Sequence, residues 1–511
     1  MSDLAIELKG IDKSFGPIHA NRNINLSVRK GTIHGIIGEN GAGKSTLMSI
    51  LYGFYLADRG QILVNGNEIT IRDPNVAIAS GIGMVHQHFM LVDNFTVLEN
   101  VMLGAEENAI LNRGIVNARA ELKRLEDEYA LEVDPDAVIE ELPVGLQQRV
   151  EILKALYRGA DILILDEPTG VLTPAEADHL FRILEQLRDQ GKTIIFITHK
   201  LREIMAITDE VSVMRRGEMV ATRKTAETSV EELAELMVGR RVLLRVEKGE
   251  ANPQDVKLSV RDLTVRDSRD VVMVDNVSLD VRAREIVGIA GVAGNGQSEL
   301  LQAITGIRHA ESGSVMLEDK PIDVTTDSDP QDLRMRGMAH VPEDRHHMGL
   351  VLSFEENENA ILGYHYDETY LNGPMLDLNS IRTSAAESIE QYDIRPPEVR
   401  LKTASFSGGN QQKIVLAREM ERDPTVLVIG QPTRGVDVGA IEFIHKLIIE
   451  MRDAGKAVLL VSVELDEIRA LSDRILVMFA GRIVGERTPE ATEGELGLLM
   501  AGIEEEKEAA Q

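Results

Sequence analysis

Residues 38–46, with the sequence Gly-Glu-Asn-Gly-Ala-Gly-Lys-Ser-Thr, constrain this chain most because they fit the pattern G-x-x-x-x-G-K-[ST]. The apolar residues 32–37 before them predict a short buried strand, and residues 47–51 after them predict the first turns of a helix. In that setting the glycines let backbone N–H groups turn towards an anion, and the helix N-terminus attracts it further. Lys44 can reach the outer phosphates of a nucleotide and Ser45 can ligate Mg²⁺, so the stretch predicts a phosphate loop rather than an ordinary tight turn.

Charge and composition exclude several classes of function. The formal net charge is −29 over 511 residues, which repels phosphate backbones, so we expect no binding of DNA or RNA by the molecule as a whole. The chain has no cysteine, which excludes disulfides and thiolate metal sites. It has no apolar run of about 18 residues, and its first residues do not resemble a secretory signal. We therefore expect a cytosolic protein unless a partner holds it elsewhere.

Two positions outside the phosphate loop could contact a nucleotide. Residues 4–37 alternate apolar and polar side chains and predict short β-strands, with Phe15 in a turn between two of them. Phe15 could stack on an adenine ring or pack within its hairpin, and the sequence alone leaves both readings open. The buried strand predicted at 81–85 leads into Gln87, which is placed to reach Mg²⁺ or a water beside the phosphates. The neighbouring His86 and His88 have no third ligand nearby, so we do not expect them to form a metal site.

A pair of carboxylates follows another strongly apolar strand. Residues 162–165 are all apolar and end in Asp166 and Glu167, at the edge of a parallel sheet where nucleotide sites lie in doubly wound folds. Asp166 suits a water-mediated hold on Mg²⁺, and Glu167 can polarise the attacking water as general base. His199 follows the next such strand and can contact the γ-phosphate. Between these elements, residues 97–156 change to a helical period and predict an inserted helical subdomain.

The chain then repeats itself. The segment ending in Ser298 reproduces the segment ending in Ser45 at an offset of 253 residues, and later segments follow in the same order. We therefore expect a first nucleotide-binding domain over residues 4–240, a linker over 241–255, a second domain over 256–503 and an acidic tail over 504–511. The second half has lost most of the phosphate, metal and base functions, because the corresponding positions are Gln297, Glu343, Gly430, Gln431 and Val463.

The second half keeps a different feature. Residues 407–413 form a glycine-rich loop opening a helix that could present N–H groups to a phosphate, and its expected contacts are Ser407, Gly408, Gly409, Asn410 and Gln411. The first half has a poor version, with Pro143 and Leu146 at the matching places. If the halves dock head to tail, one site combines the intact phosphate loop, carboxylates and histidine of the first half with Ser407 to Gln411 of the second half. The other site then combines the altered motifs of both halves. The alternative is a second half that is only a scaffold, without a role for Ser407 to Gln411.

These motifs together resemble the ATP-binding subunit of an ABC importer, in the tandem class that serves simple sugars and nucleosides. The resemblance covers essentially the whole chain. It makes the phosphate loop the Walker A motif, Gln87 the Q-loop, residues 142–147 a degenerate signature and His199 the H-loop. It also makes Asp166 and Glu167 the Walker B acid and catalytic glutamate, residues 406–413 the good signature and 433–437 a D-loop. Together these readings predict ATP binding by Phe15, Gly38, Glu39, Asn40, Gly41, Ala42, Gly43, Lys44, Ser45, Thr46 and Ser407 to Gln411, metal binding by Ser45, Gln87 and Asp166, and catalytic roles for Glu167, His199 and Gln87.

The resemblance implies an α/β fold of two tandem ABC-type P-loop NTPase domains, each with a mixed or antiparallel β subdomain and an inserted helical subdomain. It also implies ATP and Mg²⁺ as cofactors, with ATP binding closing the two halves and hydrolysis reopening them. Permease subunits would receive that motion, an extracytoplasmic binding protein would select the substrate, and this chain would lie at the cytoplasmic face of the membrane.

Residues 84–92 and 431–435 resemble the nucleoside importers. The ribose and galactose members usually keep the Walker B acids in their second half, whereas this chain has Gly430 and Gln431 there. This difference favours nucleosides, with a simple sugar such as ribose or galactose as the alternative.

Two alternatives from other classes are a soluble tandem ABC ATPase without a permease and a regulatory nucleotide-binding module without turnover. The short linker, the single competent site and the absence of cysteine disfavour the first. The presence of Glu167 and His199 disfavours the second.

Overall fold

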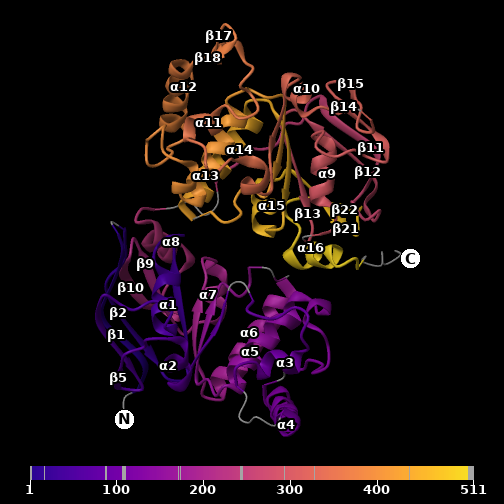
Figure 1. Ribbon diagram of the computed structural model, residues 1–511. Coiled ribbons are helices and arrows are strands. Elements are labelled where there is room, and N and C mark those ends of the chain that lie inside the picture. Colours follow the sequence, from indigo (N-terminus) through magenta and orange to yellow (C-terminus); the bar gives the residue numbers. More distant parts are fainter. Residues whose placement is uncertain are drawn as a thin grey trace. The chain divides into compact units, whose positions relative to one another are not determined.

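The structure is a computed structural model, and it describes residues 3–16, 18–86, 89–105, 111–129, 131–170, 172, 174–241, 246–292, 294–326, 328–436 and 438–503. The chain divides into two compact units, Met1–Val242 and Leu243–Gln511. Each unit contains an antiparallel four-stranded sheet, a six-stranded core sheet and a helical segment (Figure 1). The sequence prediction of an α/β fold with two similar halves is confirmed by this architecture.

In the first unit, the antiparallel sheet has the strand order β2-β1-β4-β5 and the core sheet the order β10-β9-β3-β8-β7-β6. Strands β3, β6, β7, β8 and β9 run parallel to their neighbours, and β10 closes one edge in the antiparallel sense. The strands are β1 (Leu4–Phe15), β2 (Ile18–Arg29), β3 (Ile33–Gly38), β4 (Arg59–Val64), β5 (Asn67–Ile69), β6 (Ile82–Val85), β7 (Ile162–Asp166), β8 (Thr193–Ile197), β9 (Glu210–Arg215) and β10 (Glu218–Lys224).

The helices of the first unit connect these strands. They are α1 (Lys44–Tyr52), α2 (Pro74–Ala79), α3 (Val97–Met102), α4 (Leu111–Tyr129), α5 (Val144–Tyr157), α6 (Pro174–Asp189), α7 (Leu201–Ile207) and α8 (Val230–Val238), with short 3-10 turns at Ile139–Glu141 and Thr225–Glu227. Helices α3, α4 and α5 fall between β6 and β7, where the sequence predicts a helical insertion.

The second unit repeats this order. Its antiparallel sheet is β12-β11-β14-β15 and its core sheet is β16-β19-β20-β13-β21-β22. The strands are β11 (Val256–Arg266), β12 (Val272–Arg282), β13 (Glu285–Ala290), β14 (Ser312–Leu317), β15 (Lys320–Ile322), β16 (Met338–Val341), β19 (Val426–Gly430), β20 (Ala457–Ser462), β21 (Arg474–Phe479) and β22 (Arg482–Arg487).

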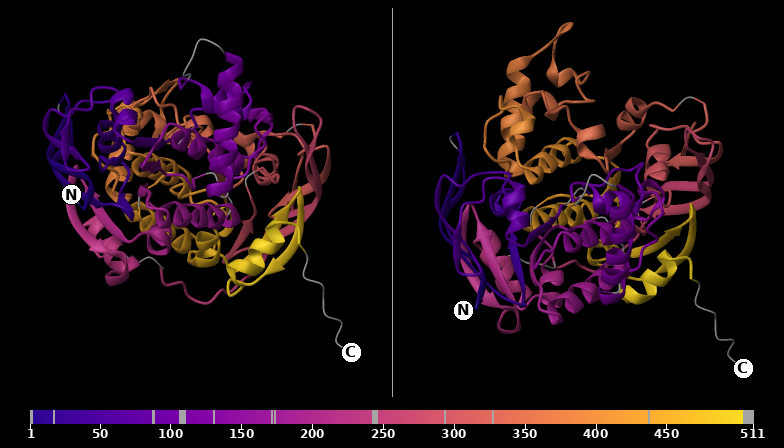
Figure 2. Two further views of the ribbon diagram at one scale, coloured as in Figure 1. Left: turned by 90° about the horizontal axis from the view of Figure 1, so that it is seen from below. Right: turned by 60° about the horizontal axis from the view of Figure 1, so that its bottom comes forward.

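The helical segment of the second unit, drawn in orange, projects to one side of the core, and the sheet of β12, β11, β14 and β15 lies on the other side (Figure 1; Figure 2, right). That segment carries a small hairpin, β17 (Leu371–Asn372) and β18 (Met375–Leu376). The helices of this unit are α9 (Gln297–Ile304), α10 (Pro330–Met335), α11 (Glu356–Ala360), α12 (Leu378–Gln391), α13 (Gly408–Met420), α14 (Val438–Asp453), α15 (Leu465–Leu471) and α16 (Glu493–Met500). A π-helical turn spans Arg345–Gly349, and 3-10 turns span Glu368–Tyr370 and Thr403–Ser405.

The central strands form because their residues are apolar on both faces. Every residue of β3, β7 and β8 is buried, as expected for parallel strands covered by helices on each side. The same holds for β13, β19 and β20 in the second unit. Burying each large aliphatic side chain of such strands contributes about 1.5–3 kcal/mol to the free energy of unfolding. The strands are therefore rigid supports for the loops that follow their carboxyl ends.

The domain limits at 4–240 and 256–503 and the linker at 241–255 stay predictions. Residues 504–511 of the expected acidic tail lie outside the described residues. Within the described ranges, no helix is both long and apolar enough to cross a bilayer.

Candidate functional site

The phosphate loop of the first unit connects β3 to α1. Gly41 and Gly43 have φ values of 81° and 99°, in the left-handed region that favours glycine. A Cβ atom on Gly43 would lie 2.2 Å from the carbonyl oxygen of Ala20, so only glycine fits there. The side-chain amide of Asn21 donates to the carbonyl oxygen of Gly43 at 3.1 Å and supports the loop from β2. The backbone therefore holds a curled conformation in front of the first turn of α1.

Lys44, the first residue of α1, turns back over this loop. Its ammonium donates to the carbonyl oxygens of Gly38 at 2.7 Å and Glu39 at 3.2 Å, and the residue is only 6% exposed. Burial lowers the pKa of Lys44, while the charges of Glu167, Asp166 and Glu39 act in the opposite direction. Lys44 thus lies close enough to both carboxylates of β7 to interact with them.

The two carboxylates lie where β7 ends, with Asp166 as the last residue of the strand and Glu167 as the residue after it. Asp166 is buried, and burial together with the charge of Glu167 raises its pKa, while a hydrogen bond from Ser45 lowers it. The hydroxyl of Ser45 and the carboxylate of Asp166 are hard oxygen donors that lie side by side, which is the ligand chemistry Mg²⁺ prefers. These residues therefore fit the metal expected from the sequence.

Glu167 follows in a left-handed backbone conformation, with φ of 48°, and its N–H donates to the carbonyl oxygen of Ile197 at 2.9 Å. This bond ties Glu167 to the neighbouring strand β8, which ends two residues before His199. His199 Nδ1 lies 3.0 Å from Glu167 Oε1. Burial raises the pKa of Glu167, but the hydrogen bond and charge of His199 and the charges of Lys44 and Lys200 outweigh it and hold the pKa below its usual value. Glu167 is thus a carboxylate at neutral pH, as a general base must be.

Phe15 is the last residue of β1 and is 41% exposed. Its ring meets that of Tyr55 edge to face at a centroid distance of 5.1 Å, and Lys13 Nζ lies 5.5 Å from its centroid. Phe15 therefore packs against Tyr55 and leaves part of its ring facing solvent. Gln87 and His88 lie outside the described residues.

The second unit keeps the shape of this site. Gly294 and Gly296 have φ values of 88° and 98°, almost those of Gly41 and Gly43. Gln297 Nε2 donates to the carbonyl oxygen of Val292 at 3.1 Å, just as Lys44 bonds its own loop, but the amide carries no charge. The second loop therefore keeps the backbone conformation of the first but has no ammonium group to bind phosphates.

The acidic end of the strand is altered in the same way. Gly430 ends β19, and Gln431 has the left-handed φ of 47° and donates from its N–H to the carbonyl oxygen of Val461, as Glu167 does to Ile197. The side-chain oxygen of Gln431 accepts from the N–H of Val463 at 3.3 Å. A neutral amide and an aliphatic side chain thus replace the carboxylate and the imidazole.

Ser298 and Glu343 complete the altered site. Ser298 Oγ donates to Glu343 Oε2, and Arg434 Nη1 lies 3.6 Å from Glu343 Oε1. These groups line a pocket of about 240 Å³ together with His340. The hydroxyl that matches Ser45 is therefore bonded to a carboxylate that stands at the Gln87 position.

Ser407 caps the N-terminus of α13. Its hydroxyl accepts from the N–H of Asn410 at 3.4 Å and from the side-chain amide of Asn410 at 2.9 Å. Gln411 Nε2 donates to the carbonyl oxygens of Thr403 and Phe406, which fixes the turn before the helix. In the first unit Gln147 makes the matching bonds to Ile139 and Leu142, but Pro143 stands at the cap and provides no side-chain bond. Gly408 and Gly409 follow Ser407 in the first turn of α13.

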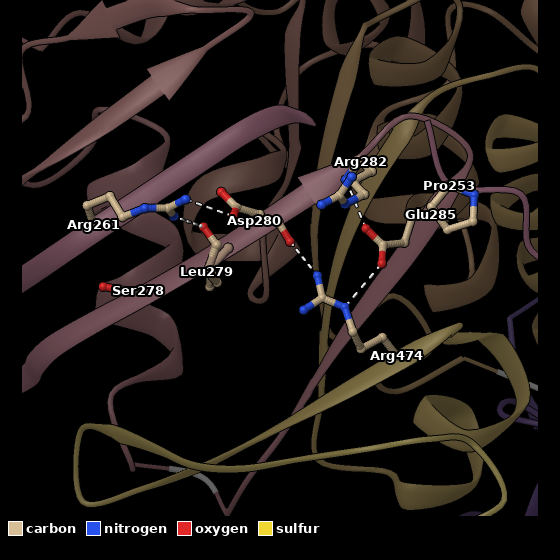
Figure 3. A pocket seen from close by; sticks show the side chains of 8 residues that line it. All are labelled: Pro253, Arg261, Ser278, Leu279, Asp280, Arg282, Glu285 and Arg474. Atoms are coloured by element: carbon tan, nitrogen blue, oxygen red, sulfur yellow. Dashed lines mark hydrogen bonds and ion pairs between the residues drawn. The ribbon is translucent and has the colours of Figure 1, made fainter. Parts of the chain in front are cut away.

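Another hollow of the second unit, of about 510 Å³, lies elsewhere. It is at the amino ends of β13 and β21, whereas the loop of Gln297 follows the carboxyl end of β13. Its charged side chains bond one another and nearby carbonyls: Arg474 bonds Glu285 and the carbonyl oxygen of Asp280, and Arg261 bonds the carboxylate of Asp280 (Figure 3). We assign no ligand to this hollow.

Two residues that support the first site are absent from the sequence predictions. Asn21 bonds the phosphate loop from a distant strand, and no local pattern singles it out. Glu203 bonds the loops that carry Glu167 and His199. Its recurrence as Glu467 at the same distance from Val463 is a repeat signal that could have identified it.

The geometry of the first unit defines a P-loop protein equipped to hydrolyse a nucleoside triphosphate. The model of the ABC transporter family matches residues 21–170 and 274–434, so the chain belongs to that family. This result confirms the resemblance stated from the sequence.

Similar proteins match over almost their entire lengths. The nucleoside import ATP-binding protein NupA of Lactococcus lactis subsp. cremoris (strain MG1363) is 49% identical over 98% of this chain and 99% of its own. The guanosine import ATP-binding protein NupO of Bacillus subtilis (strain 168) is 50% identical, with 98% of each chain covered. The glucose import ATP-binding protein TsgD13 of Haloferax volcanii is 44% identical, with 97% of this chain and 96% of its own covered.

Among solved structures, the complex of the archaeal ribosome recycling factor aABCE1 with the ribosomal stalk protein aP1 matches with a TM-score of 0.60. The match covers 94% of this chain and 90% of the other at 18% identity, which supports the shared fold alone.

Proposed function

We propose that this chain is the ATP-hydrolysing subunit of an importer of nucleosides. The observation that carries the proposal is the contact of His199 with Glu167 beside Lys44, in a chain that is about half identical over its full length to proteins named for nucleoside and guanosine import. The contacts in the first unit support ATP hydrolysis, and the names of the relatives support nucleosides as the transported substrate.

The residues of the first unit have distinct roles in this proposal. The N–H groups of residues 38–46 and the ammonium of Lys44 bind the phosphates, and Glu167 accepts a proton from the attacking water, which is worth about 10²–10⁴ in rate. His199 holds the carboxylate of Glu167 through their hydrogen bond and faces the γ-phosphate. Ser45, Asp166 and Gln87 would hold Mg²⁺, which neutralises charge on the phosphates when it is bound.

We further propose that the two units dock head to tail within one chain, so that Ser407 to Gln411 complete the phosphate loop of the first unit. Gly408 and Gly409 begin α13, and the N–H groups at a helix N-terminus point towards a place where phosphate oxygens can bind. Losses in the two units are complementary, since the unit with Lys44 and Glu167 has Pro143 and the unit with Ser407 has Gln297 and Gln431. The proposal thus contains one hydrolytic site and one site that at most binds nucleotide weakly.

Integral-membrane permease subunits and an extracytoplasmic binding protein are the partners in this proposal, and the chain lies at the cytoplasmic face of the membrane. The substrate itself touches only those partners. The proposed limits of the two domains are 4–240 and 256–503. A simple sugar is the second candidate cargo, because the relative named for glucose import is 44% identical.

Uptake in cells tests the proposal. With Glu167→Gln as the only copy of this chain, we expect uptake of labelled nucleosides to fall at least about tenfold and uptake of labelled ribose to be unchanged, since the carboxylate is the proposed base. Gln431→Ala, at the matching position of the second unit, is the control and should transport nucleosides normally. Loss of ribose uptake alone would mean that the chain energises import of a sugar and not of nucleosides. If neither uptake falls in cells that lack other uptake systems, the importer proposal is wrong.

A further inference from the structure

Glu203 lies in the first turn of α7, four residues after His199. Its side chain is 11% exposed, and both of its carboxylate oxygens are hydrogen-bonded. Oε1 accepts from the hydroxyl of Thr169 at 2.6 Å, and Oε2 accepts from the hydroxyl of Thr198 at 2.9 Å. One carboxylate therefore joins the loop that follows β7 to the loop that follows β8.

The two threonines are close in sequence to the groups proposed for hydrolysis. Thr169 follows Glu167 by two residues, and Thr198 directly precedes His199. Both threonines are buried, and Thr198 Oγ1 also accepts from the N–H of Lys200 at 3.0 Å, which fixes its orientation. A shift of either loop would change the 3.0 Å contact between His199 and Glu167.

The second unit provides an internal comparison. Glu467 occupies the place of Glu203, four residues after Val463, and Thr433 and Ser462 occupy the places of the two threonines. Glu467 Oε1 instead bonds Nε2 of His445 in α14 at 3.1 Å, and its Oε2 is buried with no hydrogen-bond partner among the described residues. Phe181 stands in α6 at the position of His445. The glutamate is thus present in both units, but it bonds the two loops only in the unit that has Glu167 and His199.

We propose that Glu203 is a positioning residue for ATP hydrolysis, which holds Glu167 and His199 in register by bonding Thr169 and Thr198. This inference rests on the proposed function. Glu203 acts through the two threonine hydroxyls and touches neither the nucleotide nor the attacking water. Burial raises the pKa of Glu203 above its usual value, and its bonds to the threonines and the nearby charges of Lys200 and His199 only partly offset this.

The test measures ATP hydrolysis by the full chain with its permease partners. Because a displacement of about 1 Å can cost about 10² in rate, Glu203→Ala is expected to lower kcat at least about tenfold and to leave KM for ATP within about threefold. Glu467→Ala is the matched control and should leave kcat within about threefold of the parent, because its carboxylate holds no catalytic loop. Thr198→Val and Thr169→Val remove one hydroxyl each and carry the test if Glu203→Ala does not fold.

A double-mutant cycle separates positioning from general stability. If Glu203 acts through Thr198, adding Thr198→Val to Glu203→Ala lowers kcat little further, whereas independent effects multiply. The inference is overturned if Glu203→Ala and Thr198→Val each retain the parent kcat, if Glu467→Ala lowers kcat as much as Glu203→Ala does, or if the two effects multiply. If ATP hydrolysis by the parent chain does not depend on Glu167, the proposed function is wrong, and this inference falls with it.

Discussion

Replacing Glu167 by Gln is expected to lower the turnover number for ATP hydrolysis by about 10²–10⁴ while ATP still binds. The amide has almost the same shape as the carboxylate but cannot accept a proton from water. His199 can keep a hydrogen bond to the amide oxygen, so the loops should stay in place. The measurement is phosphate release by the chain with its permease partners, together with binding of a labelled ATP analogue to the same preparation.

The control for this prediction is Gln431→Ala. Gln431 has the backbone conformation of Glu167 but no base, so its removal should change turnover by less than about threefold. If Glu167→Gln still turned over ATP at the parent rate, another group would be the base and the role of the first unit would have to be reassigned.

Replacing Lys44 by Ala is expected to abolish transport and to lower hydrolysis by about 10²–10³, because a preorganised cation at the phosphates is lost. Lys44 is buried on carbonyl oxygens of the loop itself, so its charge is already positioned where the outer phosphates bind. Gln297→Ala, the matching change in the second unit, removes a neutral amide and should be nearly silent. Measurements of kcat and KM for ATP on the two variants side by side check this difference.

Equal damage from Lys44→Ala and Gln297→Ala would contradict a single hydrolytic site. It would mean that the second loop, whose glycines keep the same left-handed conformation, binds a nucleotide on which turnover depends.

The phosphate loop and its strand and helix are predictable from the sequence because they depend on local patterns. Gly43 must be glycine because a Cβ atom there would meet the carbonyl oxygen of Ala20, the positive φ of Gly41 favours glycine, and Lys44 follows them directly. Asp166 and His199 are predictable for a related reason: Asp166 ends an apolar strand, His199 follows another by two residues, and parallel strands bring their carboxyl ends to one edge.

The supporting contacts of the site depend on strand order, which local patterns do not specify. Asn21 reaches Gly43 only because β2 passes beside the loop. Glu203 bonds Thr169 only because β7 and β8 are neighbours in the core sheet. The bond of Ser298 to Glu343 likewise requires both the second loop and the end of β16. Such contacts between distant segments need the structure.

We propose that the first turn of α13 completes the site of Lys44 and Glu167. The most direct test compares hydrolysis by Ser407→Arg and Pro143→Arg, which place the same side chain at the two matching helix starts, in the chain with its permease partners. Loss of the Ser407 cap costs about 0.5–2 kcal/mol of stability, so thermal unfolding of both variants is measured as well. We expect Ser407→Arg to lower hydrolysis about 10²-fold or more, because it blocks phosphate from the helix N-terminus, and Pro143→Arg to lower it less than about threefold. A folded Ser407→Arg variant with parent activity, or equal losses in both variants, would contradict it.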